Sequence, residues 1–325
     1  MQSKNKKVLV LYKASGRKVS EILCNFSNEI KIYTIVKPKN VFLSKLVCNF
    51  KYLDNDPSDV YFLPTEDDYI KLLYPFFLGC KNINKKWLNS NSSFFDCLTS
   101  KLKFKKLAVE CGFNVVDVFS KLSLINFDSK YVCKPDSGHG SKGIKFLYGH
   151  QLKEEHFASK GVFVEEFMKF DQIIGISGYA NNGLAESFLC HRRIVTKNKS
   201  SGASRVCKNI EVPSQHLEKA ASKVLSKINF SGPFMFEIGV CNEKFYLIEF
   251  NPRLWGSFSL FLENFAKFFN IQKKFQEKEF LVVWSDLKIK TFFWAVKNFK
   301  NNKTIIASPR LKLYAFFILV ICILE

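Results

Sequence analysis

Acidic side chains inside two neighbouring apolar segments limit the fold of this chain more than any other sequence feature. The segments are Phe234–Glu237 and Tyr246–Arg253, and a short polar stretch at Cys241–Lys244 lies between them. Unpaired carboxylates are costly to bury on strands this apolar, so these acids need a common polar environment. A tight turn at Cys241–Lys244 would pair the two segments as an antiparallel hairpin. We therefore expect an antiparallel sheet in this part of the chain.

Four polar side chains of this hairpin suggest a metal and phosphate site. Glu249, Asn251 and Arg253 alternate along one strand and share a face, and the tight turn can bring Glu237 beside them. Two carboxylates and an amide oxygen are hard ligands suited to Mg²⁺ that carries a nucleotide. The guanidinium of Arg253 could hold a phosphate oxygen. In the alternative interpretation, a glutamate pairs with an arginine at the edge of the sheet and no ligand binds.

The first ninety residues alternate between strand-like and helix-like segments, which is typical of a parallel sheet covered by helices. The expected strands are residues 8–12, 30–36 and 60–63, and the expected helices are residues 19–26, 41–50 and 69–77. No G-x-G-x-x-G motif occurs in this region, so a dinucleotide site is not supported. Residues 82–93 are rich in Asn, Ser and Lys and are interpreted as a boundary or linker.

Strands and helices follow in a more mixed order after residue 93. Helices are expected at residues 98–111, 215–227 and 257–269. Strands are expected at residues 130–134, 144–147, 162–165, 173–179, 185–190, 234–240 and 245–250.

A glycine-rich loop, Gly138–Gly143, joins two of these expected strands. It lacks the spacing of a Walker loop, but its glycines allow backbone N–H groups to approach phosphates closely. Lys134, at the end of the preceding strand, could reach the same phosphates. A plain hairpin with a solvated lysine is the alternative interpretation.

The formal net charge of +20 first indicates a polyanion partner such as nucleic acid. Only six of the 49 basic residues are arginine, and Lys, Asn and Phe are abundant throughout the chain. We therefore interpret the charge as a solvated lysine-rich surface and expect no nucleic-acid partner; a selected polyanion-binding face is the alternative. Because arginine is scarce and lysine cannot reproduce its bidentate contact with phosphate or carboxylate, the four arginines between residues 192 and 253 are candidate functional residues.

Cysteine and histidine usage excludes the common metal and disulfide frameworks. The ten cysteines are scattered singly, and no histidine has metal-ligand spacing. The polar N-terminus shows no signal peptide. These features predict a protein of the reducing cytoplasm.

Twelve apolar residues, Leu313–Leu324, stand close to the C-terminal end behind a basic stretch. A spanning helix needs about 20 residues, so this segment is short for one. It is expected to be either a terminal helix docked on the protein or an interfacial anchor with a basic collar, and spanning is the third alternative. In the second case, residues 303–325 would make weak contact with the inner face of a membrane.

The polar residues described above resemble the signature of the ATP-grasp superfamily, and the resemblance covers most of the chain. Glu237, followed twelve residues later by Glu249-x-Asn251-x-Arg253, resembles its magnesium and phosphate motif in residue type and spacing. Lys101 and Lys134 resemble its two nucleotide-binding lysines. The run Asn251–Ser257 looks most like the carbamoyl phosphate synthase-like, carboligase-type branch, which joins carboxylates to amines.

The resemblance extends to a flap and a hinge. The loop Gly138–Gly143 resembles the mobile phosphate flap, and Val164–Met168 is similar to the hinge that binds adenine through the backbone at Glu166 and Met168. Asp171 would then contact the ribose. The residues assigned to ATP in this way are Lys101, Lys134, Gly138, Gly140, Ser141, Gly143, Glu165, Glu166, Phe167, Met168 and Asp171. Those assigned to the metal, Mg²⁺ or Mn²⁺, are Glu237, Glu249 and Asn251.

The resemblance implies an α/β fold that becomes α+β in the catalytic part, with an N-terminal Rossmann-like pre-ATP-grasp domain before a two-subdomain ATP-grasp fold. The expected boundaries are 1–94 for the parallel α/β domain, 95–167 for the lid with its flap, 168–275 for the central antiparallel sheet and 276–325 for the basic and apolar tail.

The implied reaction activates a small carboxylate as an acyl-phosphate with ATP and transfers the acyl group to an amine. Arg253, Arg193 and Arg205 would hold the acyl-phosphate or the acceptor, with surface salt bridges as the alternative for the last two. Gly175 and Ser177 occupy a strand where relatives often carry an acid, so the substrate pair stays open. The alternative function is a catalytically inactive nucleotide-binding protein at a membrane surface.

Overall fold

The computed structural model of the chain describes residues 7–12, 22, 25–26, 30–35, 60–65, 70, 85–87, 97–98, 100–137, 143–158, 161–196, 204–275, 279–283 and 304–307. The chain divides into two compact units. Unit 1 comprises residues 1–88, 191–210 and 254–325, and unit 2 comprises residues 89–190 and 211–253.

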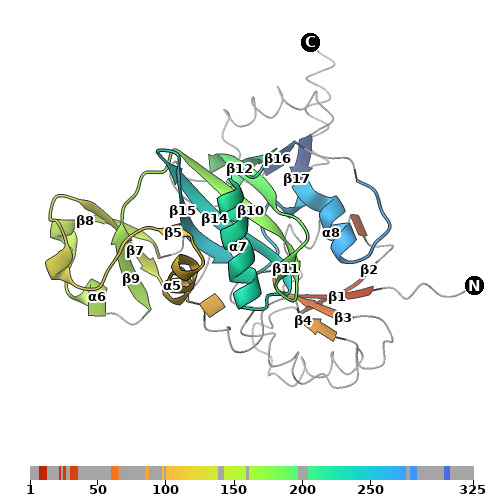
Figure 1. Cartoon of the computed structure of the whole chain (residues 1–325), viewed down its shortest axis with the longest axis horizontal. Coiled ribbons are helices and arrows are strands. Elements are labelled where there is room, and N and C mark those ends of the chain that lie inside the picture. The colour runs from red at the N-terminus through yellow and green to blue at the C-terminus, as the bar shows by residue number, and fades with distance from the viewer. Residues whose placement is uncertain are drawn as a thin grey trace, which may run out of the picture. The chain divides into compact units, whose positions relative to one another are not determined.

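Unit 1 contains a four-stranded parallel sheet in the order β2-β1-β3-β4 (Figure 1). Its strands are β1 (Lys7–Tyr12), β2 (Ile30–Ile35), β3 (Val60–Leu63) and β4 (Lys85–Trp87). The predicted parallel pairing is confirmed, whereas most of the helices expected between the strands lie outside the described residues. The boundary or linker expected at 82–93 is confirmed as a boundary, because the first stretch of unit 1 ends at Leu88, but strand β4 lies within the same segment. Its short sequence, KKW, contains no alternation that would have indicated a strand.

The remaining described strands of unit 1 are ordered β17-β16-β13-β12. They are β12 (Leu189–Thr196), which begins in unit 2, β13 (Ser204–Ile210), β16 (Phe280–Val283) and β17 (Thr304–Ala307). The helix expected at 257–269 is present as a 3-10 turn, η4 (Phe258–Phe261), followed by α8 (Leu262–Phe268). The Phe265 ring contacts Phe26 at a centroid distance of 4.8 Å. Aromatic packing therefore forms much of this core.

Unit 2 contains an antiparallel sheet in which β10, β14 and β15 are successive neighbours. The antiparallel strands are β10 (Gln172–Asn181), β11 (Leu184–Ala185), β14 (Gly232–Cys241) and β15 (Lys244–Asn251), and β5 (Asn114–Val115) pairs with β15 in parallel. Helix α7 (Gln215–Lys227) lies across one face of the sheet (Figure 1). Its buried residues follow helical spacing and pack inward. The single strand expected at 185–190 was wrong, because β11 ends at Ala185 and β12 begins at Leu189.

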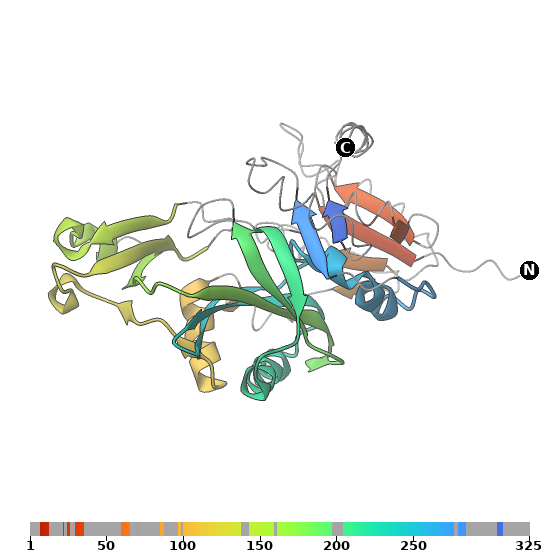
Figure 2. The same cartoon turned by 90° about the horizontal axis from the view of Figure 1, so that it is seen from above.

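A second antiparallel sheet of unit 2, called the lid sheet here, has the order β6-β9-β7-β8 (Figure 2). Its strands are β6 (Val118–Phe119), β7 (Lys130–Pro135), β8 (Lys145–Tyr148) and β9 (Val162–Glu166). The short helices of this region are η2 (Leu122–Leu124), η3 (Gly149–Gln151) and α6 (Glu155–Ala158). Helix α5 (Lys101–Glu110) precedes the lid sheet in the chain. Tyr131, Cys133 and Val164 form the centre of the lid core.

None of the helices in the described part of the chain is both long and apolar enough to cross a membrane. The apolar segment Leu313–Leu324 lies outside the described residues, so its expected membrane contact stays a prediction.

Candidate functional site

A bulge in the β14–β15 hairpin brings two predicted metal ligands face to face. The turn residues Asn242 and Glu243 have φ angles of 48° and 62°, and Cys241 pairs with Lys244 across them. Continued without interruption, this register would place Glu237 opposite Ile248. The register shifts after Ile238, and Glu237 instead pairs with Glu249. The bulge therefore re-aims a carboxylate, as bulges near binding sites often do.

Asn251 and Arg253 lie beyond this pair and contact each other. The Arg253 guanidinium donates a hydrogen bond from Nη2 to Oδ1 of Asn251 at 2.7 Å, and both residues are buried. An amide oxygen has a second lone pair, so this bond leaves one acceptor position on Asn251.

Lys101 connects helix α5 to the hairpin. Its Nζ lies 3.2 Å from Oε1 of Glu249, and the two side chains are 20% and 22% exposed. The structure thus brings the first predicted nucleotide lysine into contact with a predicted metal ligand.

The start of α5 is fixed by two side chains. Ser100 caps the helix by accepting a hydrogen bond from the backbone N–H of Lys103. Asp136, which follows β7, accepts the Leu102 N–H on Oδ1 at 2.8 Å, and its backbone oxygen accepts the Lys101 N–H at 2.9 Å. A carboxylate here also interacts favourably with the helix dipole. Asp136 therefore holds Lys101 near the end of the strand that carries Lys134.

Lys134 binds a carboxylate that a second lysine shares. Glu165 pairs with Lys134 through Oε1, and accepts a hydrogen bond on Oε2 from Lys105 Nζ at 2.5 Å. Glu165 lies opposite Val132, so Lys134 is its diagonal neighbour across β7 and β9. Burial lowers the pKa of Lys105, while the Glu165 carboxylate acts in the opposite direction. Sequence analysis missed Lys105. Its position among the apolar helix residues Phe104, Leu107 and Ala108 was a signal that its side chain is buried and needs an acidic partner.

The predicted adenine hinge follows β9. The Glu166 N–H donates to the backbone oxygen of Asp117, just before β6, and the Phe167 N–H donates to that of Lys130 in β7, each at 3.0 Å, so both amides already have partners. The next residue, Met168, is half-buried. An adenine contact through the Glu166 N–H would therefore need a rearrangement.

Asp171, the predicted ribose ligand, lies at the turn end of the hairpin. Its N–H donates to the Val240 oxygen at 2.8 Å, and its Oδ2 accepts the Asn242 N–H at 3.1 Å. Val240 is three residues along β14 from Glu237, which corresponds to roughly 10 Å. The described contacts of Asp171 support the hairpin turn, and its ribose role stays a prediction.

Several predicted residues are not brought together by the described structure. Gly138, Gly140 and Ser141 lie outside the described residues, and Gly143 is the flap residue that is described, with a φ of 77°. Arg193 and Arg205 belong to unit 1, and the side chain of Arg205 is outside the description. Their placement beside Arg253 therefore stays a prediction.

The donor set of the hairpin fits Mg²⁺ in chemical type. Glu237 and Glu249 are paired across the strands, and Met235 pairs with Asn251, so all three oxygen-bearing side chains lie on one face. Within the described ranges, no three His, Cys, Asp or Glu side chains are close enough to hold a metal. A cation here would thus rely on the two carboxylates, the Asn251 amide and oxygens from a ligand.

The neighbouring strand carries neutral residues on this same face. Gly175 pairs with Glu237, and Ser177 pairs with Met235. Ser177 is fully buried and donates from Oγ to the Leu189 oxygen at 3.3 Å. The face therefore gains no third carboxylate from these two positions of β10.

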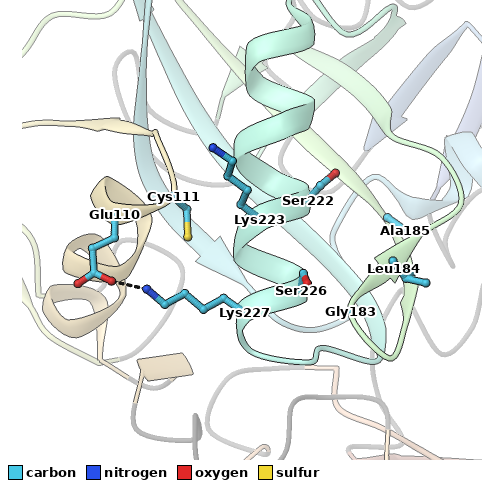
Figure 3. Close-up of a pocket in the computed structure, with 9 residues that line it drawn as sticks. All are labelled: Glu110, Cys111, Gly183, Leu184, Ala185, Ser222, Lys223, Ser226 and Lys227. Carbon is cyan, nitrogen blue, oxygen red and sulfur yellow. Dashed lines mark hydrogen bonds and ion pairs between the residues drawn. The ribbon is translucent and has the colours of Figure 1, made fainter.

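A pocket of about 550 Å³ lies elsewhere in unit 2, among α5, α7 and the β10–β11 turn (Figure 3). Lys227 pairs with Glu110 at its rim, and Lys223 projects beside them from the same helix. Burial raises the pKa of the Cys111 thiol, which also lines the pocket, so this thiol is a poor nucleophile. None of the lining residues is a predicted nucleotide or metal ligand.

Unit 1 contains a buried histidine that sequence analysis did not single out. The Ser257 hydroxyl lies 3.2 Å from the His191 ring nitrogens, and both residues are buried. Burial, with a contribution from Arg193, lowers the pKa of His191 to about 3. The imidazole is therefore neutral at pH 7 and links strand β12 to the segment after residue 253.

Comparisons with known proteins agree with this geometry. Residues 98–257 match the family described as ATP-grasp domain. No curated protein matches the chain in sequence.

Solved structures share the fold at low sequence identity. N5-carboxyaminoimidazole synthase from Aspergillus clavatus aligns with a TM-score of 0.60 and 9% identity, over 83% of this chain and 78% of that one. Biotin carboxylase from Campylobacter jejuni aligns with 0.57 and 13%, over 77% and 66%. L-Amino acid ligase from Bacillus licheniformis aligns with 0.56 and 14%, over 79% and 69%. Residues 98–257 thus match the ATP-grasp domain model, and most of the chain shares the fold of these solved structures.

Proposed function

We propose that the protein is an ATP- and Mg²⁺-dependent ligase that activates a carboxylate as an acyl-phosphate and joins it to an amine. The observation that carries this proposal is the hairpin face on which Glu237 and Glu249 oppose each other beside Asn251 and Arg253. The ATP-grasp domain and structural relatives named as ligases and as a carboxylase support it.

In the proposed reaction, a substrate carboxylate oxygen forms a bond to the γ-phosphorus while the bond to the ADP oxygen breaks. The amine then attacks the acyl carbon, inorganic phosphate leaves, and the amine loses a proton. No side-chain nucleophile is needed, so the chain's contribution is positioning and charge stabilisation.

Each group of residues has a role in this proposal. Lys101 and Lys134 would bind phosphate oxygens, and Arg253, with Arg193 and Arg205, would hold the transferred phosphoryl group or the acceptor. Glu237, Glu249 and Asn251 would hold Mg²⁺, which when bound neutralises phosphate charge. The Lys101–Glu249 ion pair would have to open or widen when nucleotide and metal bind.

Hydroxylamine trapping tests the proposal. The purified protein is incubated with ATP, Mg²⁺, hydroxylamine and a panel of carboxylates, and ADP, phosphate and hydroxamate are measured. An acyl-phosphate is electrophilic, so the correct carboxylate should give hydroxamate in step with ADP and phosphate.

Two outcomes would contradict the proposed reaction. ADP formation that does not depend on any carboxylate would exclude acyl-phosphate formation, and AMP with pyrophosphate would indicate adenylate chemistry. ATP binding without turnover across the panel of carboxylates and amines would instead indicate an inactive nucleotide-binding protein.

A further inference from the structure

Glu165 is the only carboxylate described in contact with Lys105 and Lys134, and the three side chains form a charged cluster inside the lid. Lys105 uses one oxygen of Glu165 and Lys134 uses the other. Two ammonium groups therefore share one carboxylate, which leaves the cluster with an excess of one positive charge when all three groups are ionised.

The two lysines differ in how they are held. Lys105 is buried, donates a second hydrogen bond to the Val116 oxygen at 3.4 Å, and lies 5.8 Å from the centroid of the Phe163 ring. Lys134 is 13% exposed and stands one residue from the end of β7, four residues before the first glycine of the glycine-rich loop. Lys105 is therefore the anchored member of the cluster, and Lys134 is the accessible one.

Stability alone does not account for the buried lysine, Lys105, beside Glu165. Removing an ammonium group from water is costly, and replacing a buried ion pair by apolar side chains is often neutral or stabilising. Without Lys105, Lys134 would be the sole cation for Glu165, and the carboxylate would neutralise it and hold it away from other anions.

We propose that Lys105 is a positioning residue for nucleotide binding, which balances the Glu165 carboxylate so that the ammonium of Lys134 keeps its charge available to a phosphate. The inference rests on the proposed function, because it takes Lys134 as a nucleotide-binding lysine. Lys105 itself touches no phosphate in this arrangement and acts through Glu165.

Calorimetric titration of ATP, with and without Mg²⁺, tests this role in four variants. They are Lys105→Met, Lys134→Met, the double variant, and Lys106→Met as a matched control, because Lys106 is an exposed lysine on the same helix. Lys105→Met is expected to raise the ATP dissociation constant by about tenfold or more, as loss of one nearby positive charge should. Lys106→Met should stay within about twofold of wild type.

The double variant separates positioning from an independent effect. If Lys105 acts only through Lys134, adding Lys105→Met to Lys134→Met should weaken ATP binding by no more than about twofold. Additive losses would overturn the inference, because they would show that Lys105 acts on the nucleotide by another route. Thermal unfolding of each variant shows whether the affinity change accompanies a change in stability.

Failure of the inference differs from failure of the proposed function. If the wild type binds ATP and Lys134→Met weakens binding, but Lys105→Met does not, the inference is wrong and the proposed ATP site stands. If the wild type binds no ATP, the proposed function fails first.

Lys105→Gln provides a second variant if Lys105→Met does not fold, because it keeps an N–H donor but no charge. The same loss of affinity is expected. If neither variant folds, Lys105 is required for the lid itself and the positioning role is overturned.

Discussion

The lid and the hairpin each pair lysine with glutamate, but in different proportions. In the lid, Lys105 and Lys134 share Glu165, so cations outnumber the acid. On the hairpin, Glu237 and Glu249 oppose each other, Lys101 contacts the second, and Arg253 lies on the same face, so the acids and the cations are equal in number. The excess of positive charge suits the lid to an anion such as phosphate, whereas the two carboxylates of the hairpin are oxygen ligands suited to a cation.

Burial differs between the two regions as well. Glu165 is 4% exposed, whereas Glu249 is 22% exposed. A buried carboxylate with two partners is held in one place, while a half-buried one can exchange a lysine for a metal and water. The lid cluster therefore acts as a fixed support, and the hairpin face has the freedom to change partners.

The largest expected effect comes from removing a charge on the hairpin. Glu249→Gln should lower ATP turnover by at least about a hundredfold, because loss of one ligand charge weakens stabilisation of the phosphoryl group. ADP release in a coupled assay measures the effect, and binding of ATP without Mg²⁺ should persist. Glu243→Gln, at the exposed turn of the same hairpin, is the control. Wild-type turnover in folded Glu249→Gln would remove the metal assignment.

The second effect comes from His191, a buried neutral base near the cation Arg193, in contrast to the charged lysines of the lid. The pKa of His191 is lowered to about 3, so the unfolded chain binds a proton below its ordinary value of about 6.5 while the folded protein does not. Stability should therefore fall as the pH drops through this window. Between pH 7 and pH 5, this residue should account for about 2 kcal/mol of that loss.

Urea unfolding of wild type and His191→Asn at both pH values checks this assignment. The carboxylates titrate in both proteins. The difference between the two proteins in how far the free energy of unfolding changes with pH therefore gives the contribution of His191. Equal pH dependence in the two proteins would show that His191 is not the buried neutral base described above.

The third effect concerns the geometry of a cation on the hairpin. Arg253→Lys keeps the charge but cannot both bond Asn251 and present a planar fork, so we expect about a tenfold loss of ATP turnover. Steady-state ADP release measures it. A Lys variant as active as the wild type would mean that only charge is needed at this position.

The smallest effect is expected where the lid joins helix α5. Asp136→Ala removes the side-chain acceptor of the Leu102 N–H and should lower the free energy of unfolding by about 1 kcal/mol. Urea unfolding measures the loss, and Asp128→Ala, an exposed aspartate of the same lid, is the control. Equal stability of the two variants would show that Asp136 does not support the helix.

Much of the fold followed from local patterns in the sequence. The parallel pairing of β1, β2 and β3 could be predicted because apolar runs alternate with helical ones, and the bounds of α7 matched because its apolar spacing is regular. The strand β4 could not be predicted, since three residues show no periodicity.

Only part of the candidate site could be predicted from local patterns in the sequence. The parity of Glu249 and Asn251 is a local property and could be predicted. The opposition of Glu237 and Glu249 depends on a bulge at Ile248, and with the two-residue turn alone Glu237 would lie opposite Ile248. Lys105 and Asp136 act through contacts 60 and 34 residues away in sequence, which no local pattern reveals.

Asp136 also has a consequence for local opening of the protein. One residue supplies both the acceptor for the Leu102 amide and the backbone oxygen for the Lys101 amide, and its own N–H donates to the Gly161 oxygen at 2.8 Å. The first turn of α5 and the end of β7 are therefore joined in one cooperative unit. Their amide hydrogens should exchange with solvent at similar rates, and a fluctuation that frees one predicted nucleotide lysine should free the other as well.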